Sequence, residues 1–188
     1  ALLGHMNVQT DTVNVVGTYT GINSALSLTV DGATANVNVT GTGSLNVIRD
    51  ANVSNGGALA VALGGTLSAN AVNSSATTNV NGTFTAGSLN VTGGTTTIDS
   101  GATLNVPTIN VSNGGTLATS GIAAGVDTIA VDSSELAVSG DVTLASTLNL
   151  QGGFINATGA SSITANTLAL NGNPDINVDG DFTLTANE

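Results

Sequence analysis

The sequence predicts an all-β fold: a parallel β-solenoid, wound as a right-handed β-helix of about nine coils with roughly 20 residues each and essentially no helix. Three observations support this prediction. Aliphatic and small polar residues alternate along most of the chain, glycine-rich turns interrupt the alternation, and two motifs recur after nearly equal intervals. An antiparallel sandwich would also contain short alternating strands, but it would not predict the internal repetition.

Short segments in which every second residue is aliphatic occur throughout the chain. Each places two aliphatic side chains on one face of a strand and small polar side chains on the other, the pattern of a half-buried strand. The predicted strands include 27–30, 44–47, 88–91, 103–106, 108–111, 135–138, 147–150, 167–170, 175–178 and 181–184.

Glycine, often beside Asn or Asp, separates these strands, because tight corners need residues that tolerate a positive φ. Corners are predicted at 31–32, 55–57, 64–65, 81–82, 93–94, 113–115, 152–153 and 179–180. No stretch of about 11 residues or more combines a helical period with good helix formers, so we expect almost no helix.

Two motifs recur at almost the same offset. The segment 52–60 (NVSNGGALA) returns as 110–118 (NVSNGGTLA) 58 residues later, and 44–47 returns as 103–106 59 residues later. This offset corresponds to about three coils of roughly 20 residues. With the usual strand spacing of ~4.8 Å, about nine coils would form a rod about 40–45 Å long.

The first six residues, ALLGHM, differ from everything that follows. We interpret residues 1–6 as an expression remnant, because Gly4, His5 and Met6 read as a cleavage and cloning scar. Residues 7–188 are then expected to form a single solenoid domain and to be a segment of a longer repeat protein. This interpretation removes the only histidine and the only methionine from the functional candidates.

The charge balance excludes several classes of partner. Twelve acidic residues against one basic residue, Arg49, give a net charge of −11. Binding to nucleic acid or to an anionic membrane surface needs Lys and Arg, so neither is expected. No apolar run approaches the ~20 residues that span a bilayer, so no membrane insertion of this segment is expected. The chain also has no cysteine, which excludes disulfides and thiolate chemistry.

The best metal-binding pattern lies near the C-terminus and matches the opening of an EF-hand-type calcium loop, in which alternate oxygens surround the ion. The candidate ligands are Asp175, Asn177, Asp179 and Asp181. Position twelve of such a loop would be Ala186 instead of Glu, and flanking helices are lacking. The alternative is a strand, an Asp-Gly corner and a second strand, because Ile176 and Val178 fit the burial of every second residue. Calcium is the one cofactor candidate.

The sequence predicts no enzyme activity. A polysaccharide lyase needs a basic residue to remove a proton, and Arg49 alone does not meet that need. A glycoside hydrolase needs paired carboxylates, and the densest acidic stretch outside the C-terminal one contains Asp127, Asp132 and Glu135. Aromatic platforms for sugars are scarce: the aromatic residues are Tyr19, Phe84, Phe154 and Phe182. No histidine remains to activate a serine or threonine.

Threonine pairs are a further candidate, because regular ranks of Thr-x-Thr on a flat solenoid face can bind ice. The pairs occur at 18–20, 83–85 and 95–97, and they do not recur in every coil. We therefore interpret these threonines as exposed strand residues, for which threonine is well suited.

The repeated Asn-Gly-Gly-x-Leu and Ser/Thr-Leu-Asn-Val elements resemble the passenger regions of bacterial autotransporters and filamentous-haemagglutinin-like adhesins. Those regions are right-handed parallel β-helices rich in Gly, Asn, Ser and Thr and poor in Cys and charge. The resemblance covers residues 22–184 and rests on repeat style and composition. It implies export by a bacterium and display outside the cell. The family has no shared catalytic or binding set, so the resemblance assigns no functional residue.

The expected function is a non-catalytic structural or adhesive segment of a bacterial secreted or cell-surface protein, with an extracellular location. Expected partners are a host cell, a glycan or a neighbouring cell surface, together with flanking repeats of the same parent chain. Two alternatives stay open: a carbohydrate-binding solenoid module attached to a secreted enzyme, and a fragment of a polysaccharide lyase or glycoside hydrolase.

Overall fold

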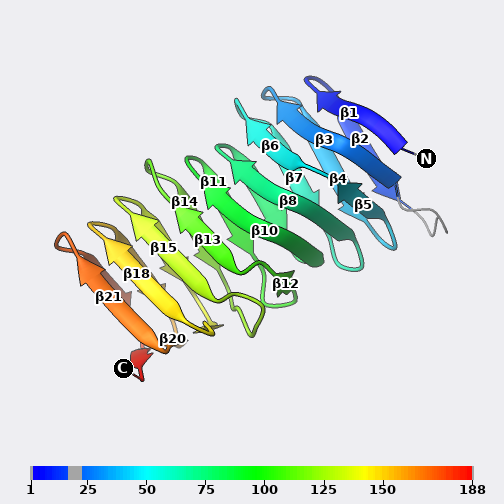
Figure 1. Ribbon diagram of the computed structural model, residues 1–188. Coiled ribbons are helices and arrows are strands. Elements are labelled where there is room, and N and C mark those ends of the chain that lie inside the picture. Colours follow the sequence, from blue (N-terminus) through cyan, green and yellow to red (C-terminus); the bar gives the residue numbers. More distant parts are fainter. Residues whose placement is uncertain (1, 17–22, 188) are drawn as a thin grey trace.

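The computed structural model describes residues 2–16 and 23–187, which wind into a parallel β-solenoid of about 9 stacked coils of ~20 residues (Figure 1). The nearer strands in Figure 1 run toward the top left, the return strands lie behind them, and the coils advance toward the bottom left. This winding is right-handed, so the predicted fold class is confirmed. The described residues contain no helix, and hence none long and apolar enough to cross a membrane.

The described strands form three parallel sheets. The first sheet contains β1 (Leu2–Val8), β3 (Asn23–Asp31), β5 (Ser44–Val47), β6 (Asp50–Ser54), β8 (Thr66–Ser74), β10 (Thr83–Val91), β12 (Thr103–Asn105), β13 (Thr108–Val111), β15 (Thr128–Asp132), β18 (Thr147–Gln151) and β21 (Thr167–Asn171). The second contains β2 (Thr12–Val16), β4 (Asn36–Thr40), β7 (Ala58–Val61), β9 (Thr77–Val80), β11 (Thr95–Ile98), β14 (Thr116–Thr119), β16 (Glu135–Val138), β19 (Phe154–Thr158) and β22 (Asp175–Asp179). The third contains β17 (Asp141–Thr143), β20 (Ser161–Ala165) and β23 (Phe182–Ala186).

The strand register explains the long sequence repeat. Asn52 lies beside Asn73, which lies beside Asn90, which lies beside Asn110. Three coil steps therefore separate the two copies of the NVSNGG motif, as the 58-residue offset predicts. The 59-residue offset likewise takes three steps, from β5 through β8 and β10 to β12.

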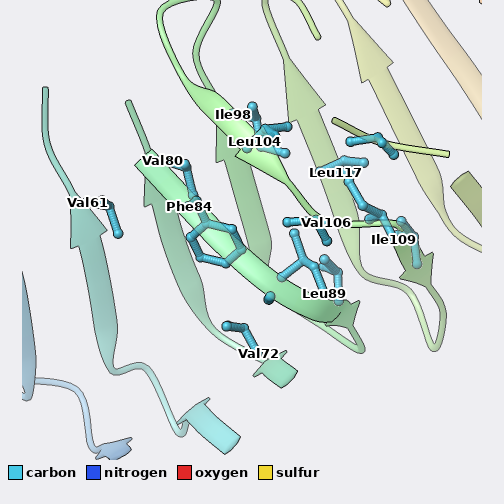
Figure 2. Close-up of a cluster of buried hydrophobic side chains, with 14 of the residues drawn as sticks. Val61, Val72, Val80, Phe84, Leu89, Ile98, Leu104, Val106, Ile109 and Leu117 are labelled. Atoms are coloured by element: carbon cyan, nitrogen blue, oxygen red, sulfur yellow. The ribbon is translucent and has the colours of Figure 1, made fainter. Parts of the chain in front are cut away.

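The core is a set of aliphatic columns that run along the inside of the stack. Because side chains alternate along each strand, every second residue of a coil points inward and lies against its counterparts in the coils before and after it. Phe84 is fully buried and lies in register between Leu67 and Leu104. Figure 2 shows its ring among smaller aliphatic side chains, including Val80 and Leu89. Apart from Phe84, the buried hydrophobic side chains of the core are all Val, Leu, Ile or Ala.

The segment that the sequence analysis set aside takes part in the first coil. Residues 2–8 form strand β1, which pairs in parallel with β3 and places Met6 beside Leu28. Ser27 Oγ lies 2.7 Å from Nδ1 of His5. Whatever the origin of residues 1–6, the first strand of the solenoid thus begins at Leu2 and runs through Asn7 to Val8.

Candidate functional site

A shallow groove with a volume of about 370 Å³ lies on the outer face of the second sheet. It crosses β11, β14, β16 and β19, and therefore runs along the stack rather than along a strand. With a coil spacing of ~4.8 Å, four adjacent strands extend over about 14 Å.

Cross-coil register explains why the surface is hollow here. Thr97, Ala118, Ala137 and Asn156 occupy one outward column, with each residue beside the next. The two alanines leave only methyl groups at the middle of this column, so the floor lies below the longer side chains at its two ends. A second outward column, at the ends of the same strands, forms one long side of the groove: Asp99, Ser120, Ser139 and Thr158.

The opposite side of the groove is bordered by a third outward column, which contains Glu135. The Glu135 carboxylate accepts a hydrogen bond from Asn156 Nδ2 at 2.9 Å and another from Thr116 Oγ1 at 3.2 Å. Phe154 follows Glu135 in the same column and is half-buried. Among the described residues, Phe154 is the aromatic side chain that a strand presents outward, since Phe84 is in the core and Phe182 lies in register with the buried Ser161.

A second hollow of about 360 Å³ adjoins the groove, and Ser120 lines both. It lies where the third face of the solenoid is interrupted. The third face is the one that carries β17, β20 and β23. Nearer the N-terminus, the first residues of β10 (83–85) pair with β12 on this same face. Between these two parts, residues 120–127 contribute only a single bridge, from Ile122 to Val142.

Hydrogen bonds hold the interrupted segment in place. The backbone N–H of Ser100 donates to Ser120 Oγ at 2.9 Å, and the N–H of Gly121 donates to Thr119 Oγ1 at 3.0 Å. At the far side of the second hollow, Asp141 Oδ1 accepts a hydrogen bond of 2.6 Å from Ser162 Oγ. The junction of the two hollows is therefore an ordered polar recess.

The four candidate calcium ligands lie on a strand and beyond its corner. Residues 175–179 form β22, Gly180 turns the chain with φ 127°, and β23 follows from Phe182. This is the strand, corner and strand of the alternative interpretation, but the expected burial of Ile176 and Val178 is wrong: both are exposed on β22. Asp175, Asn177 and Asp179 follow one another along one extended face at intervals of ~6.7 Å, which does not curve around an ion as a calcium loop does. Within residues 2–16 and 23–187, no three acidic or histidine side chains form a group that could hold a metal ion.

The acidic stretch that was weighed for glycoside hydrolysis is spread over two faces. Asp127 precedes β15 and Asp132 ends it, so this strand separates them by about 16 Å. Paired hydrolytic carboxylates lie about 5–9.5 Å apart, and this pair does not meet that requirement. Glu135 begins β16 on the next face and is held by Thr116 and Asn156. Arg49 is exposed at the corner between β5 and β6.

The threonine pairs do not stack into ranks. The pair 83–85 lies on β10 in the first sheet and the pair 95–97 on β11 in the second, while 18–20, with Tyr19, lies outside the described residues. The structure shows a different threonine column that the search for Thr-x-Thr missed. It contains Thr108, Thr128, Thr147 and Thr167, in register on β13, β15, β18 and β21. The sequence signal for this column is the Ser or Thr that begins the repeated Ser/Thr-Leu-Asn-Val strand template.

The groove was also missed, because its residues are about 20 positions apart and form no motif along the chain. Asp99, Ala118, Ala137 and Asn156 become neighbours only once the coil lengths are known. Comparisons of the chain with protein-family models, with curated proteins and with solved structures found no match.

Proposed function

We propose that this chain is a non-catalytic structural and adhesive segment of a protein displayed outside a bacterial cell. The supporting observation is the continuous stack: the first and second sheets continue from coil to coil in parallel register, from β1 and β2 to β21 and β22. A protein built this way is a rod whose length grows by ~4.8 Å with each coil, about 40 Å for the coils described.

The mechanical part of this function follows from the direction of the bonds. Hydrogen bonds between strands run along the rod axis, so a pull along the axis loads the ladders of one coil interface at a time. Each interface is also held by the aliphatic columns inside. The segment would therefore hold whatever it carries at a set distance from the cell and yield gradually under tension.

The composition supports the same role. The chain has one basic residue and no cysteine, so its stability comes from packing and hydrogen bonds, without disulfides. A chain of this kind can cross a membrane unfolded and fold outside by adding each coil to the preceding one. The resemblance to autotransporter passengers and haemagglutinin-like adhesins points to the same location.

Single-molecule pulling tests the mechanical role. Because the chain has no cysteine, Thr10→Cys and Asn187→Cys supply two unique attachment points near the ends of the stack. Extension is expected in successive steps of about 65 Å, the contour length of one coil less its thickness. Extension of the whole stack in a single step would contradict a rod whose coils bear load one at a time.

A turnover assay tests the non-catalytic part. The protein is expected to leave neutral and uronate polysaccharides unchanged over hours, with and without added calcium. Release of reducing ends or of unsaturated products would contradict the proposal and support the polysaccharide hydrolase or lyase alternative.

A further inference from the structure

We propose that the groove across β11, β14, β16 and β19 binds a short stretch of a neutral, linear glycan laid along the rod axis. This inference deepens the proposed adhesive function, on which it rests, by naming a ligand class and a binding site. This ligand class fits because the groove has an apolar floor and polar borders, which match the apolar C–H face and the hydroxyl rim of a sugar ring.

The floor of the groove is apolar and the borders are polar. The methyl groups of Ala118 and Ala137 form the floor, and Phe154 adds an aromatic surface in the column bordering it. A hexose ring has a C–H face and a rim of hydroxyls. Placed with its C–H face on the alanines, it removes apolar surface from water on both partners, while its hydroxyls reach the polar columns on either side.

The polar groups at the borders suit sugar hydroxyls. Asp99 offers a carboxylate acceptor, and the Ser139 hydroxyl, which donates to Thr119 O at 3.4 Å, can accept. Asn156 is directed by its bond to Glu135, which fixes Nδ2 on the carboxylate and leaves Oδ1 as an acceptor for a ligand hydroxyl. Because Thr116 also bonds Glu135, this border is oriented before any ligand arrives, which lowers the entropic cost of binding.

The charge at the groove selects against acidic glycans. Asp99 and Glu135 lie on opposite sides of it and Asp141 lies in the adjoining hollow, whereas the one basic residue, Arg49, is on the corner between β5 and β6. A uronate in the groove would meet only like charge, and no cation is available to offset it. A neutral glycan has hydroxyl donors for these carboxylates and carries no charge to repel.

The size and direction of the groove fit several linked rings rather than one. A volume of about 370 Å³ lies in the range of small-molecule sites. Along the stack the groove extends over about 14 Å, and a bound chain lies on the alanine floor and passes over Thr97 and Asn156 at its two ends. Such a site binds within a polymer rather than at its terminus, which suits attachment to a cell wall or a glycan-covered surface.

Isothermal titration calorimetry and chemical-shift mapping would test the site with soluble hexasaccharides of β-1,4-linked glucose and mannose, and with a galacturonic acid hexamer as the charged comparison. At least one neutral hexamer is expected to bind saturably and to shift the amides of β14 and β16. The galacturonate is expected not to bind. Saturable binding of galacturonate, or binding of neither neutral hexamer, would overturn the inference.

Ala137→Leu is the test variant, because its longer side chain fills the floor without changing the inward face of β16. It is expected to weaken binding by at least about tenfold. Ala60→Leu is the matched control: Ala60 occupies the same outward column on β7, between Asn38 and Asn79 and outside the groove, and is also half-buried. Equal affinity in wild type and in Ala137→Leu would place the ligand elsewhere and overturn the site.

Failure of this inference can be told apart from failure of the proposed function. If no neutral hexamer binds while stepwise extension persists, the groove proposal falls and the structural rod stands. If a hexamer binds and is then cleaved, the site stands and the non-catalytic function falls.

Discussion

Asn90 donates a hydrogen bond from Nδ2 to Oδ1 of Asn73, 2.8 Å away on the neighbouring coil. The same bond joins Asn73 to Asn52 at 2.9 Å and Asn110 to Asn90 at 2.9 Å. Four asparagines thus form a ladder on the outer face of the first sheet, parallel to the backbone ladder. It adds side-chain bonds between coils at positions where alternation alone requires only a polar residue.

Replacing Asn90 with Ala removes two rungs of this ladder, so we expect the free energy of unfolding to fall by about 1–2 kcal/mol. Asn149→Ala is the matched control. Asn149 lies in the same column between Ala130 and Ala169, and its buried Oδ1 has no hydrogen-bond partner among the described residues. The control is expected to lose less than about 0.5 kcal/mol. Urea denaturation of the two variants checks this, and equal losses would show that the ladder adds nothing.

The same column predicts a stabilising substitution. Ala130 interrupts the ladder between Asn110 and Asn149, so Ala130→Asn should join the two parts through new side-chain bonds. We expect a gain of about 1 kcal/mol in unfolding free energy. Ala118→Asn serves as the control, because its neighbours in register are Thr97 and Ala137 and it has no ladder to join. A gain in both variants would indicate a general effect of asparagine on this surface instead of ladder formation.

Two buried inward hydroxyls, Thr96 Oγ1 and Ser161 Oγ, have no hydrogen-bond partner among the described residues, and removal of the first should raise stability. Thr96 is fully buried and its Oγ1 has no hydrogen-bond partner among residues 2–16 and 23–187, whereas the buried Thr78 beside it has Ser74 Oγ at 3.0 Å. Thr96→Val keeps the shape and removes an unpaired hydroxyl, so stability should rise by about 1–2 kcal/mol. Thr78→Val breaks a bond and should be neutral or destabilising. Thermal denaturation checks the order of the two variants, and the reverse order would contradict this account.

The alternation of aliphatic and polar residues predicted the strands well wherever a strand follows the Ser/Thr-Leu-Asn-Val template. The predicted strand 44–47 is β5. At 103–106 the structure ends β12 at Asn105, because Val106 donates its N–H to Gly125 O at 2.7 Å and Pro107 follows without an N–H. Strand β9, with the sequence TTNV, was not among the predicted strands, because its first inward residue is Thr78 instead of an aliphatic.

The candidate site could not be predicted in the same way. A groove depends on which residues lie side by side in successive coils, and the coil steps in this protein vary. Asn73 lies 21 residues after Asn52 but only 17 before Asn90. An uneven step shifts every later register, so neither the alanine floor nor the oriented Glu135 follows from periodicity. The surface columns therefore exist only in the folded stack and cannot be read along the chain.

Phe84 lies in the core and Phe154 on the outer surface, so replacing each with Ala separates the effect of core packing on stability from the effect of the surface ring on binding. Phe84→Ala leaves a cavity in the fully buried cluster of Figure 2 and should lower stability by about 3–5 kcal/mol. Phe154→Ala acts on a half-buried outward side chain, and we expect a loss below about 1.5 kcal/mol together with weaker binding of neutral hexamers. Calorimetry on both variants gives stability and binding together. Unchanged binding in Phe154→Ala would remove the aromatic surface from the proposed site.

The interrupted third face makes one glycine indispensable. Gly125 has φ +85°, and a Cβ there would collide with the carbonyl oxygen of Leu104. Gly125→Ala combines a strained backbone with a clash against backbone that cannot move aside, so we expect a loss of more than about 2 kcal/mol. Gly114→Ala is the control, because φ there is +76° but a Cβ would meet nothing within 4 Å; its loss should be about 1 kcal/mol. Hydrogen exchange at Val106, whose N–H bonds Gly125 O, should quicken in the first variant only. Equal losses and equal exchange would mean that positive φ alone, and not the close approach of two coils, requires glycine at position 125.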